Sequence, residues 1–240
     1  MQQFMMKSCE VAGVKIECGK LFQRIPTDSG MCCAFNAESA LKASAYSDLV
    51  EEMRIKSSPD NEEKIIDNAK VGEKKGLQIL VDQHSDHTSY GTVFSNFNGF
   101  KVFIGEPAEF PVPRERSIKI QPGLEHFIEL SGYTVKTDSN VKSELPEKRK
   151  CYFKDESTLD FYSTYTFSSC KFECKLKHTS AVVGCTPWYL PHHNNTPACD
   201  PWKAAQFNTM MESDQENCTH CLADCDTTIH SVSQSSAPFR

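Results

Sequence analysis

The sequence predicts an α+β fold in which an antiparallel sheet is combined with helices that disulfides hold in place. Three observations lead to this prediction. Apolar and polar residues alternate through much of residues 77–136, apolar residues recur at helical spacing in two other segments, and eight of the twelve cysteines lie between Cys151 and Cys225. At 240 residues the chain is long enough to bury a sizeable core, in one large domain or two smaller ones.

The cysteine content places the chain in an oxidising compartment. Twelve cysteines in 240 residues are many for a reducing cytosol, and they suit an extracellular chain in which disulfides persist. The N-terminus has neither the charged start nor the apolar core of a signal peptide, so we expect the chain to be a piece of a longer protein. No run approaches the roughly 20 apolar residues that span a bilayer. The net charge of -6, without a basic stripe, argues against nucleic-acid binding.

The first segment contains two pairs of cysteines with different expectations. Cys9 and Cys18 flank eight residues that could form a small hairpin loop, which a Cys9–Cys18 bridge would close. Cys32 and Cys33 follow an Asp-Ser-Gly turn signal. Adjacent cysteines rarely bridge each other, so at least one of these two needs a partner elsewhere.

A helix and a loop are predicted next. Apolar residues recur at helical spacing from Asn36 to about Met53, with Asn36 placed to cap the helix and Pro59 beyond its end. Residues 57–75 are polar and lack periodicity, which indicates a surface loop.

A meander of antiparallel strands should follow. Period-2 alternation predicts strands at 77–81, 100–104, 117–121, 126–130 and 133–136, with a turn at Pro122-Gly123. We expect this sheet to bury its apolar residues, which are Leu77, Ile79, Val81, Phe100, Val102, Ile118, Ile120, Phe127 and Leu130. His84 and His87 could hold a metal ion, although a solvated loop is the simpler interpretation.

The cysteine-rich segment follows a charged linker at Lys142–Lys150. A helix is predicted from Ser157 to about Leu176, with Cys170 and Cys174 on one side of it. Residues 185–191 contain two prolines and should be extended, and residues 185–217 offer few apolar side chains.

The cysteine spacing is mirrored on the far side of this segment, at Cys218, Cys221 and Cys225. If the two cysteine-bearing stretches lie antiparallel, a nested ladder follows. Its rungs are Cys151–Cys225, Cys170–Cys221, Cys174–Cys218 and Cys185–Cys199. Spacing alone leaves about 105 connectivities open. A zinc site is the alternative, since Cys218 and Cys221 have ligand spacing and His220, Cys225 and His230 lie close by.

Two sequons suggest N-glycosylation. They begin at Asn194 and Asn217, both in the loop-rich part, as such sites must be to meet the transferase.

Seven motifs resemble one family in its own order. They are Gly30-Met-Cys-Cys-Ala-Phe-Asn36, Gly76-Leu-Gln-Ile-Leu-Val-Asp82, Gly99-Phe-Lys-Val-Phe-Ile104 with Glu106-Pro, Ile120-Gln-Pro-Gly123, Arg149-Lys-Cys-Tyr-Phe153, residues 165–174 and residues 185–191. Together they resemble the extracellular domain of degenerin/epithelial sodium channels, most of all the arthropod pickpocket branch.

This resemblance implies a trimeric, amiloride-sensitive, sodium-selective channel of the plasma membrane, with homo- or heteromeric subunits as partners. It implies an extracellular domain with a palm sheet, a β-ball, a helical finger, a knuckle and a disulfide-stapled helical thumb. Residues 1–75 would be part of the finger and its return to the palm, 76–141 the palm and β-ball, 142–225 the linker and thumb, and 226–240 the start of the return to the palm. The thumb bridges would be nested as in the ladder above.

The resemblance also implies what the chain lacks. The partner of Cys32 would lie upstream. Family members usually carry two cysteines separated by one residue, and here Val183 stands at the first of these positions and Cys185 at the second. A further family cysteine between the positions of Cys199 and Cys218 is also absent, as though one whole bridge had been dropped. Both membrane helices and the pore would lie outside residues 1–240, so this segment alone could not conduct sodium.

Two functions from different classes are therefore carried forward. The first is the extracellular region of a sodium-channel subunit, and the alternative is a soluble, secreted, disulfide-rich binding or decoy module. An enzyme is not expected, because no Gly-x-Ser-x-Gly elbow, phosphate loop or His-Glu-x-x-His pair occurs, and no cofactor is expected either.

Overall fold

The structure, a computed structural model, describes residues 5–36, 72, 75–83, 97–106, 109–113, 117–193, 195–213 and 218–239. Its strands are β1 (Met6–Val11), β2 (Val14–Ile16), β3 (Phe22–Thr27), β4 (Gly30–Phe35), β5 (Leu77–Val81), β6 (Phe100–Val102), β7 (Ile118–Ile120), β8 (Leu124–Val135), β9 (Cys151–Tyr152), β10 (Ala223–Asp224) and β11 (Thr227–Pro238). Its helices are α2 (Cys18–Leu21), the 3-10 helix η4 (Ser139–Ser143), α4 (Pro146–Arg149), α5 (Phe167–Val183) and α6 (Pro201–Glu212).

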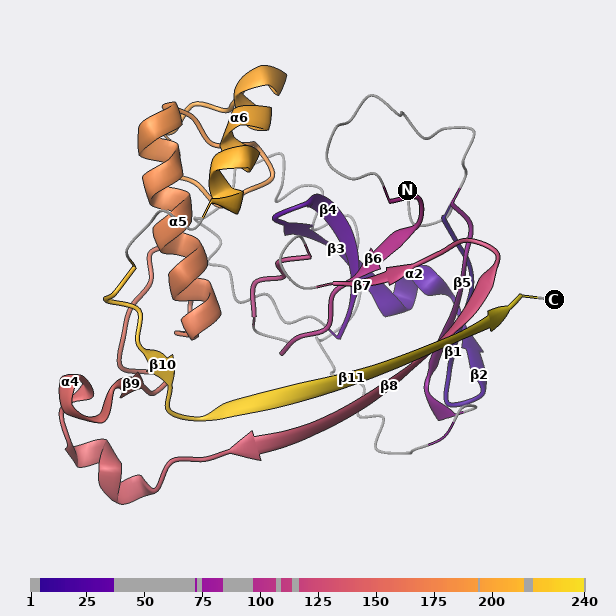
Figure 1. Cartoon of the computed structure of the whole chain (residues 1–240), viewed down its shortest axis with the longest axis horizontal. Coiled ribbons are helices and arrows are strands. Elements are labelled where there is room, and N and C mark those ends of the chain that lie inside the picture. The colour runs from indigo at the N-terminus through magenta and orange to yellow at the C-terminus, as the bar shows by residue number, and fades with distance from the viewer. Residues whose placement is uncertain are drawn as a thin grey trace.

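Helices and strands occupy different parts of the molecule. In Figure 1, α5 and α6 lie together on the left, the short sheets β1–β2–β5, β3–β4 and β6–β7 lie on the right, and the β8–β11 pair runs beneath both. The predicted mixture of helices with antiparallel strands is thus confirmed. The pairing is distributed over several small sheets in the described residues, and β9–β10 is parallel.

The predicted meander is wrong around β8. Residues 124–135 form one continuous strand, where the alternation predicted two, and it pairs antiparallel with β11 through twelve register positions from Leu124–Pro238 to Val135–Thr227. We refer to β8 and β11 as the ribbon. The partner of β8 comes from the far end of the sequence. The prediction missed it because alternation shows where strands lie but not which strands pair.

The hairpin at the N-terminus follows the prediction. Strands β1 and β2 join through Ala12 and Gly13, whose φ angles of 53° and 83° are typical of the tight turns that hairpins favour. The Cys9–Cys18 disulfide then ties β1 to α2.

Helix α5 begins ten residues later than predicted, at Phe167, and continues to Val183. Thr166 caps it by accepting a hydrogen bond from the Ser169 backbone N–H at 3.0 Å. The segment before α5 is kept out of the helix by Glu173. The Glu173 carboxylate accepts hydrogen bonds from the backbone N–H groups of Asp160 at 2.9 Å and Phe161 at 3.0 Å. Those two hydrogen bonds compete with helix formation and explain the late start.

Helix α6 was missed. Asp200 caps it by accepting the backbone N–H groups of Trp202 and Lys203 at 3.0 and 2.9 Å, and Pro201 occupies the first turn. An aspartate followed by proline is a helix-start signal that could have located it. The interpretation of residues 185–217 as poor in packing side chains is also wrong, because Phe207 and Leu190 are fully buried.

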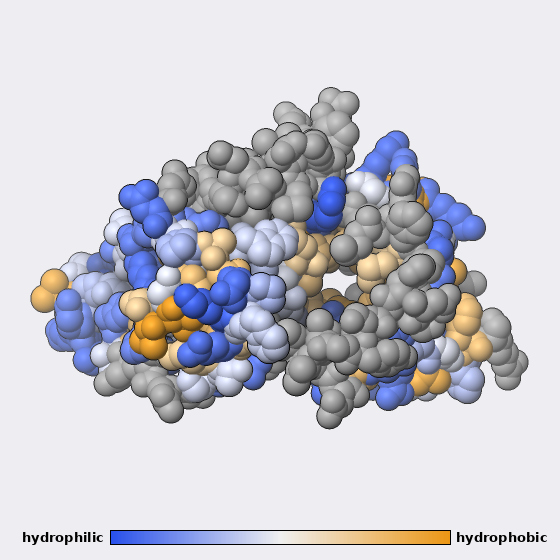
Figure 2. Space-filling view, turned by 90° about the horizontal axis from the view of Figure 1, so that it is seen from above, coloured by the Kyte–Doolittle hydropathy of each residue, from blue (hydrophilic) through white to orange (hydrophobic). Residues whose placement is uncertain are grey.

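The main core lies in the helical part and not under the sheets. It gathers Phe110, Val112, Leu159, Phe161, Tyr162, Tyr165, Cys170, Phe172, Leu176, Leu190, Phe207, Cys218 and Cys221. By contrast, Leu130 on β8 is 55% exposed, and Ile79, Val81 and Phe127 are exposed too. The predicted sheet core is therefore wrong, because alternation shows that a strand has an apolar face but not what covers it. Figure 2 shows the helical part on the left as mainly hydrophilic around one small hydrophobic patch.

The segment predicted as a charged linker is folded. The side chain of Arg149 is 3% exposed and pairs with Glu156. It donates to the backbone oxygens of Lys142 at 3.2 Å and Glu144 at 2.7 Å, and its guanidinium lies 4.9 Å from the centre of the Phe153 ring. This explains the Arg149-to-Phe153 motif as an anchor for the turn between the ribbon and the helical part.

Candidate functional site

Five disulfides connect ten of the twelve cysteines. They are Cys9–Cys18, Cys151–Cys225, Cys170–Cys221, Cys174–Cys218 and Cys185–Cys199, with Cα–Cα distances of 5.3, 5.0, 5.7, 6.2 and 5.1 Å. The last four are nested around α5 and α6. The outermost of them, Cys151–Cys225, ties β9 to the residue after β10. The pairs therefore coincide with the ladder that the mirrored spacing allows.

This pairing removes the ligands of the alternative zinc site. Cys170, His220 and Cys221 are close enough to hold a metal ion, but the two sulfurs are bonded to each other. Cys218 and Cys225 are likewise in bridges, so no thiolate is available to bind zinc there. His84 and His87 lie outside the described residues, as do both sequon asparagines, Asn194 and Asn217.

Cys32 and Cys33 belong to none of the five disulfides. Both lie on β4, opposite Ile25 and Arg24 of β3. Cys32 is partly buried, and its sulfur lies 3.4 Å from the Thr27 hydroxyl. Burial raises the pKa of the Cys32 thiol, and the charge of Asp28 adds to the rise against the opposing hydrogen bond from Thr27.

We therefore expect Cys32 to react slowly with iodoacetamide. The thiolate is the reactive form, so a raised pKa and partial burial both lower the rate. Peptide mass spectrometry of the folded, unreduced protein at pH 7 should show less than about a tenth of the labelling reached in denaturant. Equal labelling in the two conditions would contradict the buried position of this thiol.

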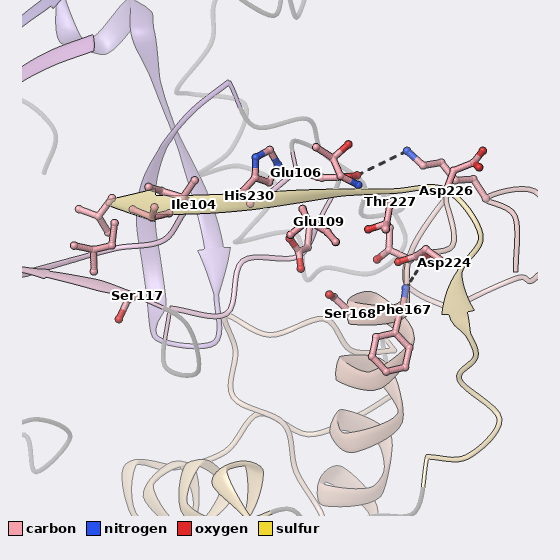
Figure 3. A pocket seen from close by; sticks show the side chains of 18 residues that line it. Ile104, Glu106, Glu109, Ser117, Phe167, Ser168, Asp224, Asp226, Thr227 and His230 are labelled. Atoms are coloured by element: carbon pink, nitrogen blue, oxygen red, sulfur yellow. Dashed lines mark hydrogen bonds and ion pairs between the residues drawn. The ribbon is translucent and has the colours of Figure 1, made fainter. Parts of the chain in front are cut away.

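A pocket of about 490 Å³ lies where the ribbon meets the first turn of α5. Its lining comes from five separate stretches: residues 102, 104–106 and 109; residues 117–118; residue 154; residues 166–168; and residues 224, 226–230 and 232. Figure 3 shows Glu106, Glu109 and Asp224 around the space between β11 and Phe167. No pattern in the sequence predicts this pocket.

Two carboxylates of the pocket are fixed by the backbone. Asp224 accepts the backbone N–H of Phe167 at 3.0 Å and so caps α5 from outside the helix. Glu106 accepts the backbone N–H of Thr228 at 3.0 Å, and its other oxygen lies 3.9 Å from the Lys154 ammonium. The pocket thereby links the helical part, the ribbon and the segment after β6.

The Asp224 carboxyl is easier to protonate than an ordinary aspartate. Burial raises its pKa to about 6, and the charges of Glu106 and Glu109 contribute to the rise. The Phe167 N–H group and the Lys154 ammonium act in the opposite direction and do not cancel it. Asp224 is thus a carboxyl group of this pocket whose charge changes in mildly acidic solution.

The whole sequence matches a channel family. The family described as "Amiloride-sensitive sodium channel" matches residues 1–240, and the chain belongs to this family. Pickpocket protein 28 of Drosophila melanogaster is 26% identical over 92% of this chain and 40% of its own length.

Two further relatives extend the comparison. Sodium channel protein Nach of Drosophila melanogaster is 24% identical over 76% of this chain and 34% of its own length. Acid-sensing ion channel 2 of Homo sapiens is 23% identical over 93% of this chain and 39% of its own length. The chain thus spans about two fifths or less of these relatives. Within the described residues, no helix combines the length and the apolar character needed to cross a membrane.

Proposed function

We propose that this chain is part of the extracellular region of a sodium-channel subunit. The observation that carries the proposal is the family match over residues 1–240, supported by two relatives whose names are those of a sodium channel and an acid-sensing ion channel. In this proposal residues 76–141 are palm and β-ball, residues 142–225 are linker and thumb, residues 1–75 belong to the finger, and residues 226–240 begin the return to the palm. The full protein would be a trimeric plasma-membrane channel that amiloride blocks, with a glycan at Asn194 or Asn217.

The ribbon gives this segment a role in the proposed channel. Strand β11 starts beside the pocket and the thumb, where the Cys225 backbone N–H donates to the Tyr152 oxygen at 2.9 Å, and it runs without a register shift to Pro238. A stimulus that moves the helical part would therefore move the far end of the ribbon, in the direction of the proposed membrane segments.

The channel assignment is tested on the full-length protein that contains residues 1–240. Expressed in oocytes under voltage clamp, alone or with a related subunit, it should carry a sodium current that amiloride blocks. A chain that is instead secreted, and that yields no current with any related subunit, would support the binding or decoy alternative.

A second function, a response to acid, is favoured by Asp224. One relative is named an acid-sensing channel, and the pocket contains a carboxyl group whose pKa lies at about 6 beside two other acidic residues. Protonation would remove the repulsion between Asp224 and Glu106 while the two residues keep their backbone hydrogen bonds.

The pH dependence of stability tests this second function. The pKa of Asp224 is raised from its ordinary 3.8 to about 6 on folding, so the folded protein binds the proton more tightly than the unfolded chain. Stability should therefore rise as the pH falls from about 6 towards 4, and this gain should be lost again above pH 6.

Thermal unfolding of the wild type, Asp224→Asn and Asp138→Asn at pH 7 and pH 5 measures the effect. On going from pH 7 to pH 5, Tm should rise further in the wild type and in Asp138→Asn than in Asp224→Asn. Asp138→Asn is the matched control, because Asp138 caps η4 outside the pocket. The same pH response in all three proteins would remove Asp224 from the proposal.

A further inference from the structure

The sequence contains a single Asn-Gly pair, Asn98 and Gly99, and it lies directly before β6. Asparagine followed by glycine is the pair most prone to deamidation, because glycine has no Cβ to keep its backbone nitrogen away from the asparagine side chain. Asn98 is exposed to water, which the reaction consumes. The pair therefore combines the sequence and the solvent access that this modification needs.

The fold requires glycine at position 99. The φ angle of Gly99 is 147°, a conformation that residues with a side chain rarely adopt. A Cβ atom there would lie 2.1 Å from the Ile120 backbone oxygen on the paired strand β7, and 2.8 Å from the Phe97 ring. A bulkier residue that would protect Asn98 is thus excluded by the close approach of the chain to β7.

The side chain of Asn98 is held by Gln83, which follows β5 by two residues. The Gln83 side-chain N–H donates a hydrogen bond to the Asn98 Oδ1 oxygen. When a nucleophile adds to the Asn98 amide, negative charge develops on this oxygen, and a donor already aimed at it stabilises that charge. Lys119 adds positive potential, since its ammonium lies 5.6 Å from the ring centre of Phe97, the neighbour of Asn98. The donor and the charge both favour the addition step.

We propose that Asn98 is a modification site that the fold activates for deamidation. The Gly99 backbone nitrogen loses its proton and bonds to the side-chain carbonyl carbon of Asn98. The bond from that carbon to the side-chain nitrogen breaks, and the nitrogen leaves as ammonia, which gives a five-membered succinimide. Water then opens this ring at one of its two carbonyl groups and yields aspartate or isoaspartate. The overall reaction consumes only water and needs no oxidant or cofactor.

Either product changes the strand pair β6–β7. Both products add a negative charge near Lys119, whose register partner on β6 is Lys101, and two like charges placed opposite each other repel. Isoaspartate also adds one methylene to the main chain directly before Phe100, where Gly99 already lies against the Ile120 oxygen. We therefore expect aspartate to be accommodated and isoaspartate to disturb the pairing of β6 with β7.

Peptide mass spectrometry of the folded 240-residue protein during incubation at neutral pH tests the site. Deamidated peptides are recognised by their higher mass, and isoaspartate by enzymatic methylation of its carboxylate. We expect Asn98 to convert at least about tenfold faster than Asn140, which is also exposed but precedes Val141. Conversion of the two asparagines at the same rate would overturn the proposal.

Two variants at Gln83 separate the effect of the fold from that of the Asn-Gly pair. In Gln83→Ala the loss of the hydrogen bond to Asn98 should slow conversion by about threefold to tenfold, and the rate at Asn140 should stay unchanged. Gln83→Met keeps the length of the side chain but cannot donate, and it decides the matter if circular dichroism shows the alanine variant unfolded. Gln78→Ala, which removes an exposed glutamine of β5, is the matched control and should convert as the wild type does. An equal or faster rate at Asn98 in a folded Gln83 variant contradicts activation by the fold.

Discussion

Replacing Phe207 by alanine should lower the free energy of unfolding by about 3–5 kcal/mol. Phe207 lies on α6, is 0% exposed and belongs to the main core, which also contains Leu176 of α5. The substitution removes the aromatic ring and leaves a cavity beside α5. The Cys170–Cys221 and Cys174–Cys218 disulfides hold α5 in place, so the core cannot collapse fully to fill it.

The same helix offers a matched control. Trp202 is 87% exposed, so Trp202→Ala removes an aromatic side chain of similar size without opening a cavity. Its effect should stay within about 0.5 kcal/mol. Denaturant unfolding followed by circular dichroism measures both variants, and similar losses in the two would contradict the burial of Phe207.

Removing the disulfide at the centre of the ladder should have an effect of comparable size. In the double variant Cys170→Ala/Cys221→Ala, the closed loop of sequence separation 51 is released, which costs about 4 kcal/mol in the chain-entropy account. The Cys9–Cys18 bridge has a separation of 9, and its removal should cost about 3 kcal/mol.

The site of the damage distinguishes these two variants more clearly than the size of the loss. Hydrogen exchange in Cys170→Ala/Cys221→Ala should increase in α5, which carries Cys170, and in α6, which packs in the same core. In Cys9→Ala/Cys18→Ala it should increase in β1 and β2. An increase confined to the strands in both variants would show that the ladder does not hold the helices. The same experiment under mild reduction tests the division of the chain at residues 142–150.

The sequence allows a good prediction of features that depend on local spacing. The separations of three and four residues among the cysteines of 170–225 reflect helical and turn geometry, so the ladder follows from spacing once an antiparallel arrangement is assumed. The Cys9–Cys18 hairpin loop is local in the same sense. Strand positions near 77, 100 and 118 also follow from alternation.

Features that depend on distant partners were not predictable in this way. Strand β11 is mostly polar, as its Ser231, Ser233, Gln234, Ser235 and Ser236 show, so nothing in its own pattern identified it as the partner of β8. The apolar residues of the strands proved exposed or half-buried for a related reason, since burial depends on what covers a face. The pocket draws its lining from five stretches that are distant in the sequence. The closeness of Asp224 and Asp226 in the sequence was the one local feature that could have indicated an acidic site.

The ribbon has a consequence for how the protein acquires its structure during synthesis. Leu124 pairs with Pro238 and Cys151 is bonded to Cys225. Neither contact can therefore form until residues 225–238 have left the ribosome. Until that point β8 exposes an unpaired edge with Phe127, Leu130 and Tyr133 on it. Unpaired strand edges of this kind promote aggregation with other chains. Contacts that close such long loops also form slowly. We therefore expect folding of the ribbon and closure of the Cys151–Cys225 bridge to depend on chaperones and disulfide isomerases. Both steps should start only after this segment has been translated.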